Sequence, residues 1–337
     1  MRNIYDLTIK ELEDYFISIN EKKFRAVQVY EALYKRRIKS FDDMTNISKE
    51  VREKLKQDFS FYKIKMLIKQ QVKNVNKYLF ELEDGNKIES VLMFHDYGTS
   101  ICVSSQVGCN MTCAFCESGR LKKVRNLLAY EIVQQILQIE EDINKRITHV
   151  VLMGIGEPFD NYDNVLRFVK IINCGKGIDI GSRHITISTC GVIPGIKKFM
   201  NEEGQVNLAI SLHAPNDTLR SRIMPINKAY PLNELMETIK EYINKTNRRV
   251  TFEYIMLDNV NDSEENAKEL ALLLKGINCY VNLIPYNETE NIEFKRTKEW
   301  KIMKFYDILK KNKINVTIRK EFGGSVDAAC GQLRANN

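Results

Sequence analysis

From residue 100 onward, short apolar runs alternate with amphipathic helical stretches, and this rhythm constrains the fold more than any other feature. Repeated strand–helix units predict a parallel sheet flanked by helices, as an open doubly wound sheet or a barrel. In a barrel, functional side chains collect at the carboxyl ends of the strands. The expected strands are 101–105, 150–153, 184–188, 208–212, 250–256, 281–285 and 316–319, and the expected helices are 130–139, 165–172, 232–243, 264–274 and 300–309.

The residues before this region follow two other patterns. Apolar positions at helical spacing predict helices over residues 1–60, including a stripe that runs from Phe24 to Tyr34. Residues 61–98 alternate as strands do, and Asp84 with Gly85 predicts a hairpin turn. The expected organisation is therefore an N-terminal helical module (1–60), a β-rich connector (61–98) and an α/β core (99–337).

Composition places the chain in the cytoplasm. No apolar run is long enough to cross a bilayer, and the first residues lack the apolar stretch of a signal peptide. In a reducing compartment, eight cysteines favour metal binding or catalysis over a disulfide framework. Four of the eight fall within residues 102–116. The net charge of +7, most of it within residues 1–88, permits a nucleic-acid partner without requiring one.

Cys109, Cys113 and Cys116 form the most informative motif in the chain. Three thiols on a loop after a strand can turn toward one centre. Structural zinc sites usually need four ligands, often as two C-x-x-C pairs, and no second pair occurs. Three cysteines suit an iron–sulfur cluster with one iron left open. The alternative is a zinc site completed by a distant His or Cys.

The C-x-x-x-C-x-x-C spacing resembles that of the radical S-adenosylmethionine (SAM) superfamily. Gly154, Gly156 and Glu157, which follow the expected strand 150–153, resemble the segment that contacts the SAM amino group there. The resemblance implies a 4Fe-4S cluster whose open iron chelates SAM and whose electron cleaves it to a 5′-deoxyadenosyl radical. In such enzymes the cofactors supply the difficult chemistry, and the protein orients them.

Further motifs narrow the choice of family within this superfamily. They are CVSSQVG (102–108), IST (187–189), AISLHA (209–214), NLIPYN (282–287) and DAACGQL (327–333). Together they resemble the RlmN/Cfr family of ribosomal RNA adenine methyltransferases, over nearly the whole chain. The resemblance implies a partial (β/α)6 barrel, an N-terminal module of RNA-binding type, a small β-hairpin connector and a C-terminal segment that carries a catalytic cysteine.

The resemblance also implies a mechanism that uses two SAM molecules. The first methylates Cys330, and the second yields the radical that removes hydrogen from that methyl group. The methylene radical then adds to the adenine ring. Cys102 matches the second reactive cysteine, which helps to break the adduct and pairs with Cys330 as a disulfide. Glu89 matches the proton acceptor.

The expected SAM contacts carried over from the family lie at or near the carboxyl ends of predicted strands, where a barrel site belongs. The contacts are Gly156, Glu157, Ser188, Ser211, His213 and Asn287.

The implied partner is 23S rRNA in the peptidyl-transferase region, with transfer RNA as a possible second substrate. Three basic groups are candidates for phosphate contacts, at residues 35–39, 120–125 and 310–320, and the second adjoins the cysteine motif. An external electron donor such as flavodoxin or ferredoxin, a monomeric state and no membrane partner complete the expectations.

Alternatives stay open at this point. Residues 104–108 and 211–217 favour RlmN-type methylation at carbon 2, whereas Phe322 and Gly323 resemble Cfr, which methylates carbon 8 and confers antibiotic resistance. Glu117 and Cys190 depart from the family pattern, and Cys190 is expected to be a packing residue. A radical SAM enzyme with another substrate would not need Cys102 or Cys330. The non-enzymatic alternative is a metal-bearing RNA-binding protein.

Overall fold

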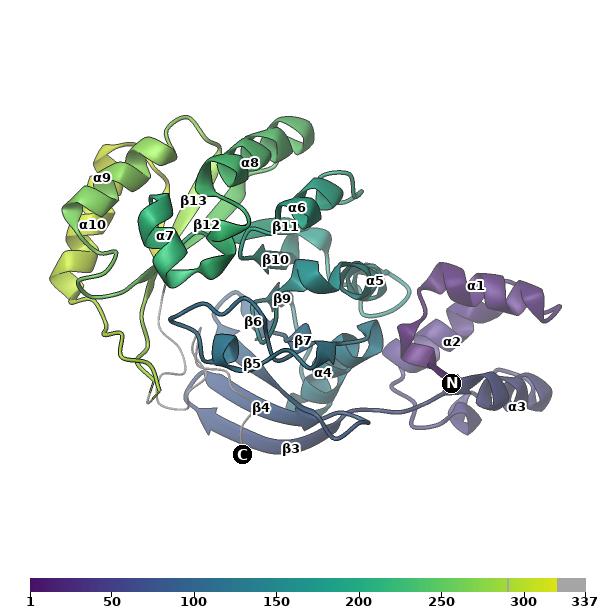
Figure 1. Ribbon diagram of the computed structural model, residues 1–337. Helices are drawn as coiled ribbons and strands as arrows, with labels where there is room; N and C mark the ends of the chain where they lie inside the picture. The colour runs from purple at the N-terminus through teal and green to yellow at the C-terminus, as the bar shows by residue number, and fades with distance from the viewer. Residues whose placement is uncertain (290, 320–337) are drawn as a thin grey trace.

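The computed structural model describes residues 1–289 and 291–319. Within these residues one curved sheet of ten strands runs through the molecule, in the order β14-β13-β12-β11-β10-β9-β6-β5-β4-β3. Figure 1 shows helices covering its outer side. The sheet is open, with β3 and β14 at its edges.

The seven strands from β6 to β14 are parallel and alternate with helices, so they form six strand–helix units and a seventh strand. The expected partial (β/α)6 barrel is confirmed. All seven expected strands are present, whereas the short helices α6 and α7 were not predicted. The strands are β6 (Gly98–Cys102), β9 (His149–Leu152), β10 (Ile185–Thr189), β11 (Asn207–Ser211), β12 (Val250–Met256), β13 (Cys279–Pro285) and β14 (Val316–Ile318); the helices are α4 (Ala129–Ile143), α5 (Tyr162–Asn173), α6 (Ile193–Phe199), α7 (Asp217–Ile223), α8 (Leu232–Thr246), α9 (Glu264–Leu273) and α10 (Glu299–Lys311).

The central strands each turn an apolar face toward the helical layer, whereas their other face carries polar residues such as Thr186 and Glu253 that line the barrel interior. Ile185, Ile187 and Ile210 are fully buried, as parallel strands between a helical layer and a barrel interior require. The helices contribute one apolar side each, such as Ile132 and Ile136 of α4.

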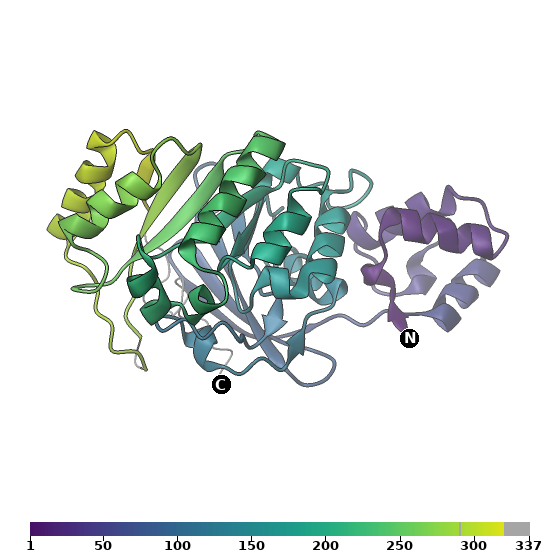
Figure 2. The same ribbon diagram turned by 45° about the horizontal axis from the view of Figure 1, so that its top comes forward.

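Three antiparallel strands, β3 (Lys65–Val72), β4 (Val75–Glu81) and β5 (Lys87–His95), extend the same sheet through the pairing of β5 with β6. The predicted hairpin turn joins β4 to β5, and Gly85 adopts the positive φ of +79° that such a turn uses. The connector strands thus continue the barrel wall, as Figure 2 shows from a second side.

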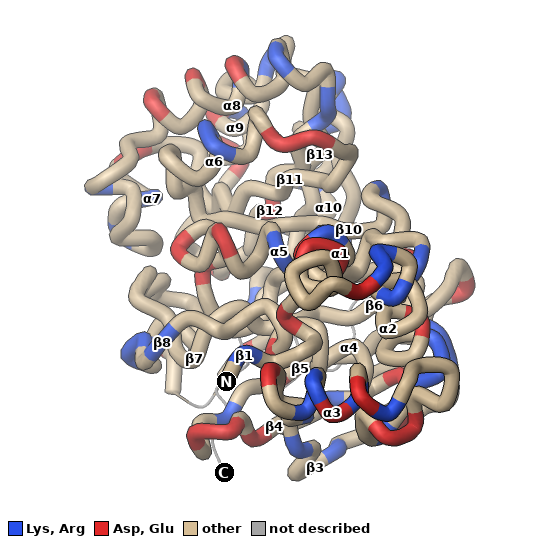
Figure 3. Tube along the Cα trace, turned by 90° about the vertical axis from the view of Figure 1, so that its right-hand side faces the viewer, with Lys and Arg blue, Asp and Glu red and all other residues tan. Residues whose placement is uncertain are grey.

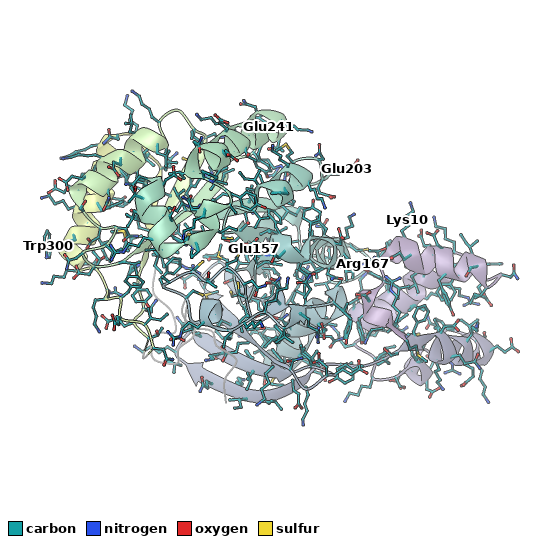
Figure 4. The ribbon with its side chains drawn as sticks, viewed as in Figure 1. Lys10, Glu157, Arg167, Glu203, Glu241 and Trp300 are labelled. Atoms are coloured by element: carbon teal, nitrogen blue, oxygen red, sulfur yellow. The ribbon has the colours of Figure 1, made fainter. Side chains whose placement is uncertain are left out.

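The N-terminal helices α1 (Ile9–Ser18), α2 (Arg25–Tyr34) and α3 (Lys49–Asp58) lie to one side of the barrel, and the short strands β1 (Arg2–Asn3) and β2 (Phe59–Ser60) pair at their base. Glu11 of α1 forms an ion pair with Arg167 of α5, which Figure 4 shows on the side that faces the module. Asp6 accepts a hydrogen bond from the Tyr130 backbone of α4 (3.2 Å). The three-part division of the chain stays a prediction.

No helix in residues 1–289 and 291–319 has the length and apolar character needed to cross a membrane.

Candidate active site

A pocket of about 140 Å³ opens at the carboxyl ends of the barrel strands. Figure 4 shows one of its lining residues, Glu157, near the centre of the molecule. Eight of the predicted site residues meet there, although they come from four separate segments of the chain. They are Cys109, Cys113, Cys116, Gly156, Glu157, Ser188, Ser211 and His213.

The cysteine loop is shaped by backbone contacts. The Cys109 amide donates to the Leu121 carbonyl (2.9 Å), and the Ala114 amide donates to the carbonyl of Ile223 at the end of α7 (2.9 Å). Gly119 packs so closely that an added Cβ would lie 2.9 Å from the Cys113 carbonyl oxygen. The loop is therefore held in place by its neighbours in the protein, with its three thiols around the pocket.

The thiols fit an iron–sulfur cluster. Burial raises the pKa of Cys109 to about 12 and raises the pKa of Cys113 well above its ordinary value. Buried thiolates therefore need a cationic partner, and coordinated iron supplies one. Among the described residues, no three His, Cys, Asp or Glu side chains are placed to hold one shared ion. The cysteines surround the pocket instead, as a cluster requires when each thiolate binds a different iron.

The glycine segment after β9 is joined to the residues that precede the cysteine loop. The Gly154 amide donates to the Val103 carbonyl (3.1 Å), and the Glu157 amide donates to Oε1 of Gln106 (2.9 Å). The approach leaves no room for a side chain, since a Cβ on Gly156 would lie 2.6 Å from that of Gln106 and its φ is +111°. Both glycines are thus needed to place this turn beside the cluster loop.

Glu157 links this turn to the end of β10. Its two carboxylate oxygens accept hydrogen bonds from the backbone amides of Cys190 (2.8 Å) and Phe159 (3.0 Å). Burial raises the pKa of Glu157, although these bonds oppose the rise. Cys190 is buried in the hydrophobic core, as expected of a packing residue, and it also lines the same pocket.

His213 lies at the end of β11 with a positive φ of +59° and is buried. Its Nδ1 accepts a hydrogen bond from the Ile255 amide (3.0 Å), and its ring packs edge-on against Phe115 of the cysteine loop. Burial, aided by the charge of Arg220, lowers the pKa of His213 to about 3. The imidazole is therefore neutral, and its Nε2 carries the proton.

Arg220 of α7 joins the loops that follow β10 and β11. Its guanidinium donates to the carbonyl oxygens of Cys190 (2.6 Å) and Leu212 (3.1 Å) and to Oδ1 of Asn227 (2.8 Å). The side chain is fully buried. No sequence motif singled out Arg220, because only the folded chain brings its partners together.

Glu89 lies on β5 and Cys102 on the neighbouring strand β6, where the connector strands join the barrel. The register pairs Val91 with Cys102, so Glu89 is two residues along the same face of β5. Glu89 is buried and forms an ion pair with Lys77 of β4 (2.9 Å), a partner that the sequence did not indicate. Cys102 belongs to a small apolar cluster against which Met153 packs, and Met153 also lines the cysteine pocket.

Asn287 and Cys330 complete the set of predicted site residues. Asn287, which follows β13, is not among the residues that line the pocket. Cys330 lies outside the described residues, so its role and its pairing with Cys102 stay predictions.

The basic group at residues 120–125 is only partly free for a ligand. Arg125 forms ion pairs with Glu131 (2.7 Å) and Asp84 (2.6 Å), which gives it a structural role at the start of α4. Lys123 is 3.5 Å from Asp160. Lys122 is exposed, beside the short strands β7 (Gln106–Val107) and β8 (Arg125–Asn126). Figure 3 shows this basic group at the edge of the molecule.

The partial barrel with three cysteines around a pocket at its carboxyl end defines a radical SAM enzyme, and the radical SAM superfamily matches residues 103–271. Such enzymes use a 4Fe-4S cluster and SAM. The thiols of Cys109, Cys113 and Cys116 are suited to the cluster.

Relatives identify the branch. Residues 2–60 match the ribosomal RNA large subunit methyltransferase N-terminal domain. The chain is 54% identical to a probable dual-specificity RNA methyltransferase RlmN of Spiroplasma citri, covering all of this chain and 98% of the relative. It is also 54% identical to a probable dual-specificity RNA methyltransferase RlmN of Enterococcus faecalis, covering 99% of this chain and 96% of the relative. A radical SAM methyltransferase from Sphaerobacter thermophilus has a TM-score of 0.94 at 41% identity, with both chains fully covered. The chain belongs to the RlmN family of radical SAM RNA methyltransferases.

Proposed function

We propose that this protein methylates carbon 2 of an adenine in the peptidyl-transferase region of 23S rRNA. Transfer RNA is proposed as a second substrate, because the full-length relatives are described as probable dual-specificity RNA methyltransferases. The observation that carries the proposal is the meeting of eight family-matched residues at one pocket.

The residues around the pocket have distinct proposed tasks. Cys109, Cys113 and Cys116 hold the cluster, which supplies the electron that cleaves SAM when both are bound. Glu157 and the Gly156 backbone hold the amino group of SAM. Their support is the buried carboxylate beside the cysteine loop and the hydrogen bonds that fix the turn.

Ser188, Ser211, His213 and Asn287 are the other proposed SAM contacts. Three of them line the pocket, and neutral His213 offers a hydrogen-bond donor at Nε2. The His213 ring is held in its orientation by the hydrogen bond from the Ile255 amide and by its edge-on contact with Phe115.

The methyl transfer requires a thiol and a base from the protein. Cys330 is the proposed methyl carrier, Cys102 the thiol that resolves the adduct, and Glu89 the group that takes a proton from the ring carbon. The role proposed for Glu89 is supported by its burial, by its contact with Lys77, and by its position on the same face of β5 as Val91, which pairs with Cys102. Lys77 is a proposed positioning residue for that carboxylate.

We further propose that the protein works in the cytoplasm as a monomer and receives electrons from a small donor such as flavodoxin or ferredoxin. Exposed Lys122, close to the cluster loop, is the proposed phosphate contact.

The decisive test is mass spectrometry of 23S rRNA and tRNA fragments after anaerobic incubation with the reconstituted protein, SAM and a reductant. We expect a new methyl group on adenine whose fragmentation matches the carbon 2 standard. A carbon 8 product would overturn the proposed position and assign Cfr-type activity.

The Cys330→Ala variant tests the methyl carrier, and Cys279→Ala is the matched control, since Cys279 is a buried cysteine away from the pocket. We expect loss of methylation only in Cys330→Ala. Methylation by that variant would overturn the mechanism. Anaerobic reconstitution that gives no visible charge-transfer absorption would instead support the metal-bearing binding protein.

A further inference from the structure

A row of aromatic rings lies at the end of the barrel opposite the cysteine pocket. His149 is the first residue of β9, and His184 directly precedes β10. His95 is the last residue of antiparallel β5, and Tyr97 lies in the turn to β6. All four rings are therefore at the amino-terminal ends of the parallel strands, where none of the predicted site residues within the described part of the chain lies.

The rings contact one another in sequence. Tyr97 stacks on His95, with 4.6 Å between ring centroids and 8° between planes. Tyr97 meets His149 edge-on at 5.3 Å, and His149 stacks on His184 at 4.3 Å and 9°. Tyr97 is 68% exposed, and His184 is exposed as well. The row therefore presents two rings, those of Tyr97 and His184, to solvent.

The row borders a cavity of about 780 Å³ inside the barrel. Met153, Glu253 and Arg319 line both this cavity and the cysteine pocket, so the two spaces meet at these residues. A molecule that reaches the cysteine pocket from the amino-terminal end of the barrel passes the aromatic row.

The cavity carries groups that match a nucleotide. Glu253 is buried at the junction and accepts a hydrogen bond from Asn282 (2.9 Å), and such carboxylate and amide groups pair with base edges. Exposed Arg183 stands at the rim, where a phosphate would lie. Aromatic rings beside such groups are the usual platform for unstacked bases.

Two other functions for the aromatic row fit the structure less well. A metal site is disfavoured because, in the described part of the chain, no three His, Cys, Asp or Glu side chains are placed to share an ion. A cationic phosphate site is disfavoured because burial lowers the pKa of His149, and His184 and His95 lower it further. The stacked rings favour aromatic contact.

We infer that His95, Tyr97, His149 and His184 form a stacking platform for the RNA bases next to the target adenine, and that the RNA enters the barrel at its amino-terminal end. This inference rests on the proposed RNA methyltransferase function. It adds a substrate contact to the barrel end that carries none of the cluster or SAM residues.

The test uses a 23S rRNA hairpin that contains the target adenine, with 2-aminopurine at the nucleotide on either side of it. Base stacking quenches 2-aminopurine fluorescence. We expect the parent protein to quench one of the two probes. We expect Tyr97→Ala to abolish that quenching and to weaken hairpin binding about tenfold, since stacking contributes on that order for each base. Tyr97→Phe keeps the ring and is expected to bind as the parent does.

Trp300→Ala is the matched control, because Trp300 is 61% exposed on α10, at the left of Figure 4, and lines neither the cavity nor the cysteine pocket. It is expected to change neither quenching nor affinity. His184→Ala provides a second exposed variant of the row and is expected to reduce both. Thermal unfolding of each variant verifies folding.

Parent-like quenching and affinity in both Tyr97→Ala and His184→Ala overturn the platform, while methylation of the hairpin by the parent protein leaves the proposed function standing. Failure of the parent protein to methylate any RNA overturns the proposed function instead. The two failures are therefore distinguishable.

Discussion

Arg220→Met gives the most direct test of how the site is built. The substitution replaces the guanidinium with a shorter, unbranched apolar side chain and removes its five donors. In the parent protein the guanidinium serves the carbonyl oxygens of Cys190 and Leu212 and Oδ1 of Asn227. All three acceptors are part of the buried loops at the carboxyl ends of the strands, so water cannot easily replace the lost donors.

The magnitude follows from these contacts. Each buried acceptor left without a donor costs about 1–3 kcal/mol, so three acceptors represent at least about 3 kcal/mol. Removal of the buried positive charge opposes this loss, because burying that charge is itself unfavourable. The same cost lowers the pKa of Arg220. We expect the free energy of unfolding to fall by about 3–5 kcal/mol, the range for a broken buried ionic network.

Urea denaturation under anaerobic conditions measures the change, and Arg222→Met is the matched control. Arg222 is exposed on the same short helix, so its loss should alter stability by less than about 0.5 kcal/mol. Arg220→Lys should fall between the two, because an ammonium reaches fewer of the acceptors. A loss below about 1 kcal/mol for Arg220→Met, or equal losses at both positions, would refute the reasoning.

Three further predictions concern other parts of the chain. Gly156→Ala should weaken SAM binding at least about tenfold in calorimetry, because the new Cβ meets Gln106 and φ is unfavourable, while Gly181→Ala, with open space around it, should bind normally. Burial alone would raise the pKa of Glu11, but hydrogen bonds from Arg167, Thr8 and Arg2 outweigh it and lower the pKa to about 2. The ionised Glu11 carboxylate therefore stabilises the fold above pH 4.5. About 1–2 kcal/mol of unfolding free energy, discounted for exposure, is lost as the pH falls toward 2. Glu11→Gln should remove this pH dependence of stability from denaturation curves. Charge reversal of Lys122 and Lys123 should weaken RNA binding in a filter assay and leave SAM cleavage intact, with Lys240→Glu on the outside of α8 as control; unchanged RNA affinity would contradict the assignment of these lysines.

The strand–helix rhythm was readable from the sequence because it reflects local physical chemistry. Buried parallel strands need continuous apolar residues, and helices need one apolar face, so each element carries its own pattern. The cysteine spacing was readable for the same reason, since its three thiols lie within eight residues of one loop. The seven expected strands formed, and eight residues at their ends or in that loop meet at one pocket.

The tertiary structure alone decided the contacts between distant segments. Arg220 donates a hydrogen bond to Cys190, 30 residues earlier in the chain, which no local pattern encodes, and Lys77 reaches Glu89 only because the two strands pair. Short α6 and α7 lacked enough turns to show a helical period. The aromatic row likewise unites His95 with His184 through adjacent strand ends. The sequence by itself therefore determined the elements and the cluster motif, because these depend on neighbouring residues. The curvature of the open sheet in space decided which side chains support the motif. It also decided which residues meet at the other end of the barrel.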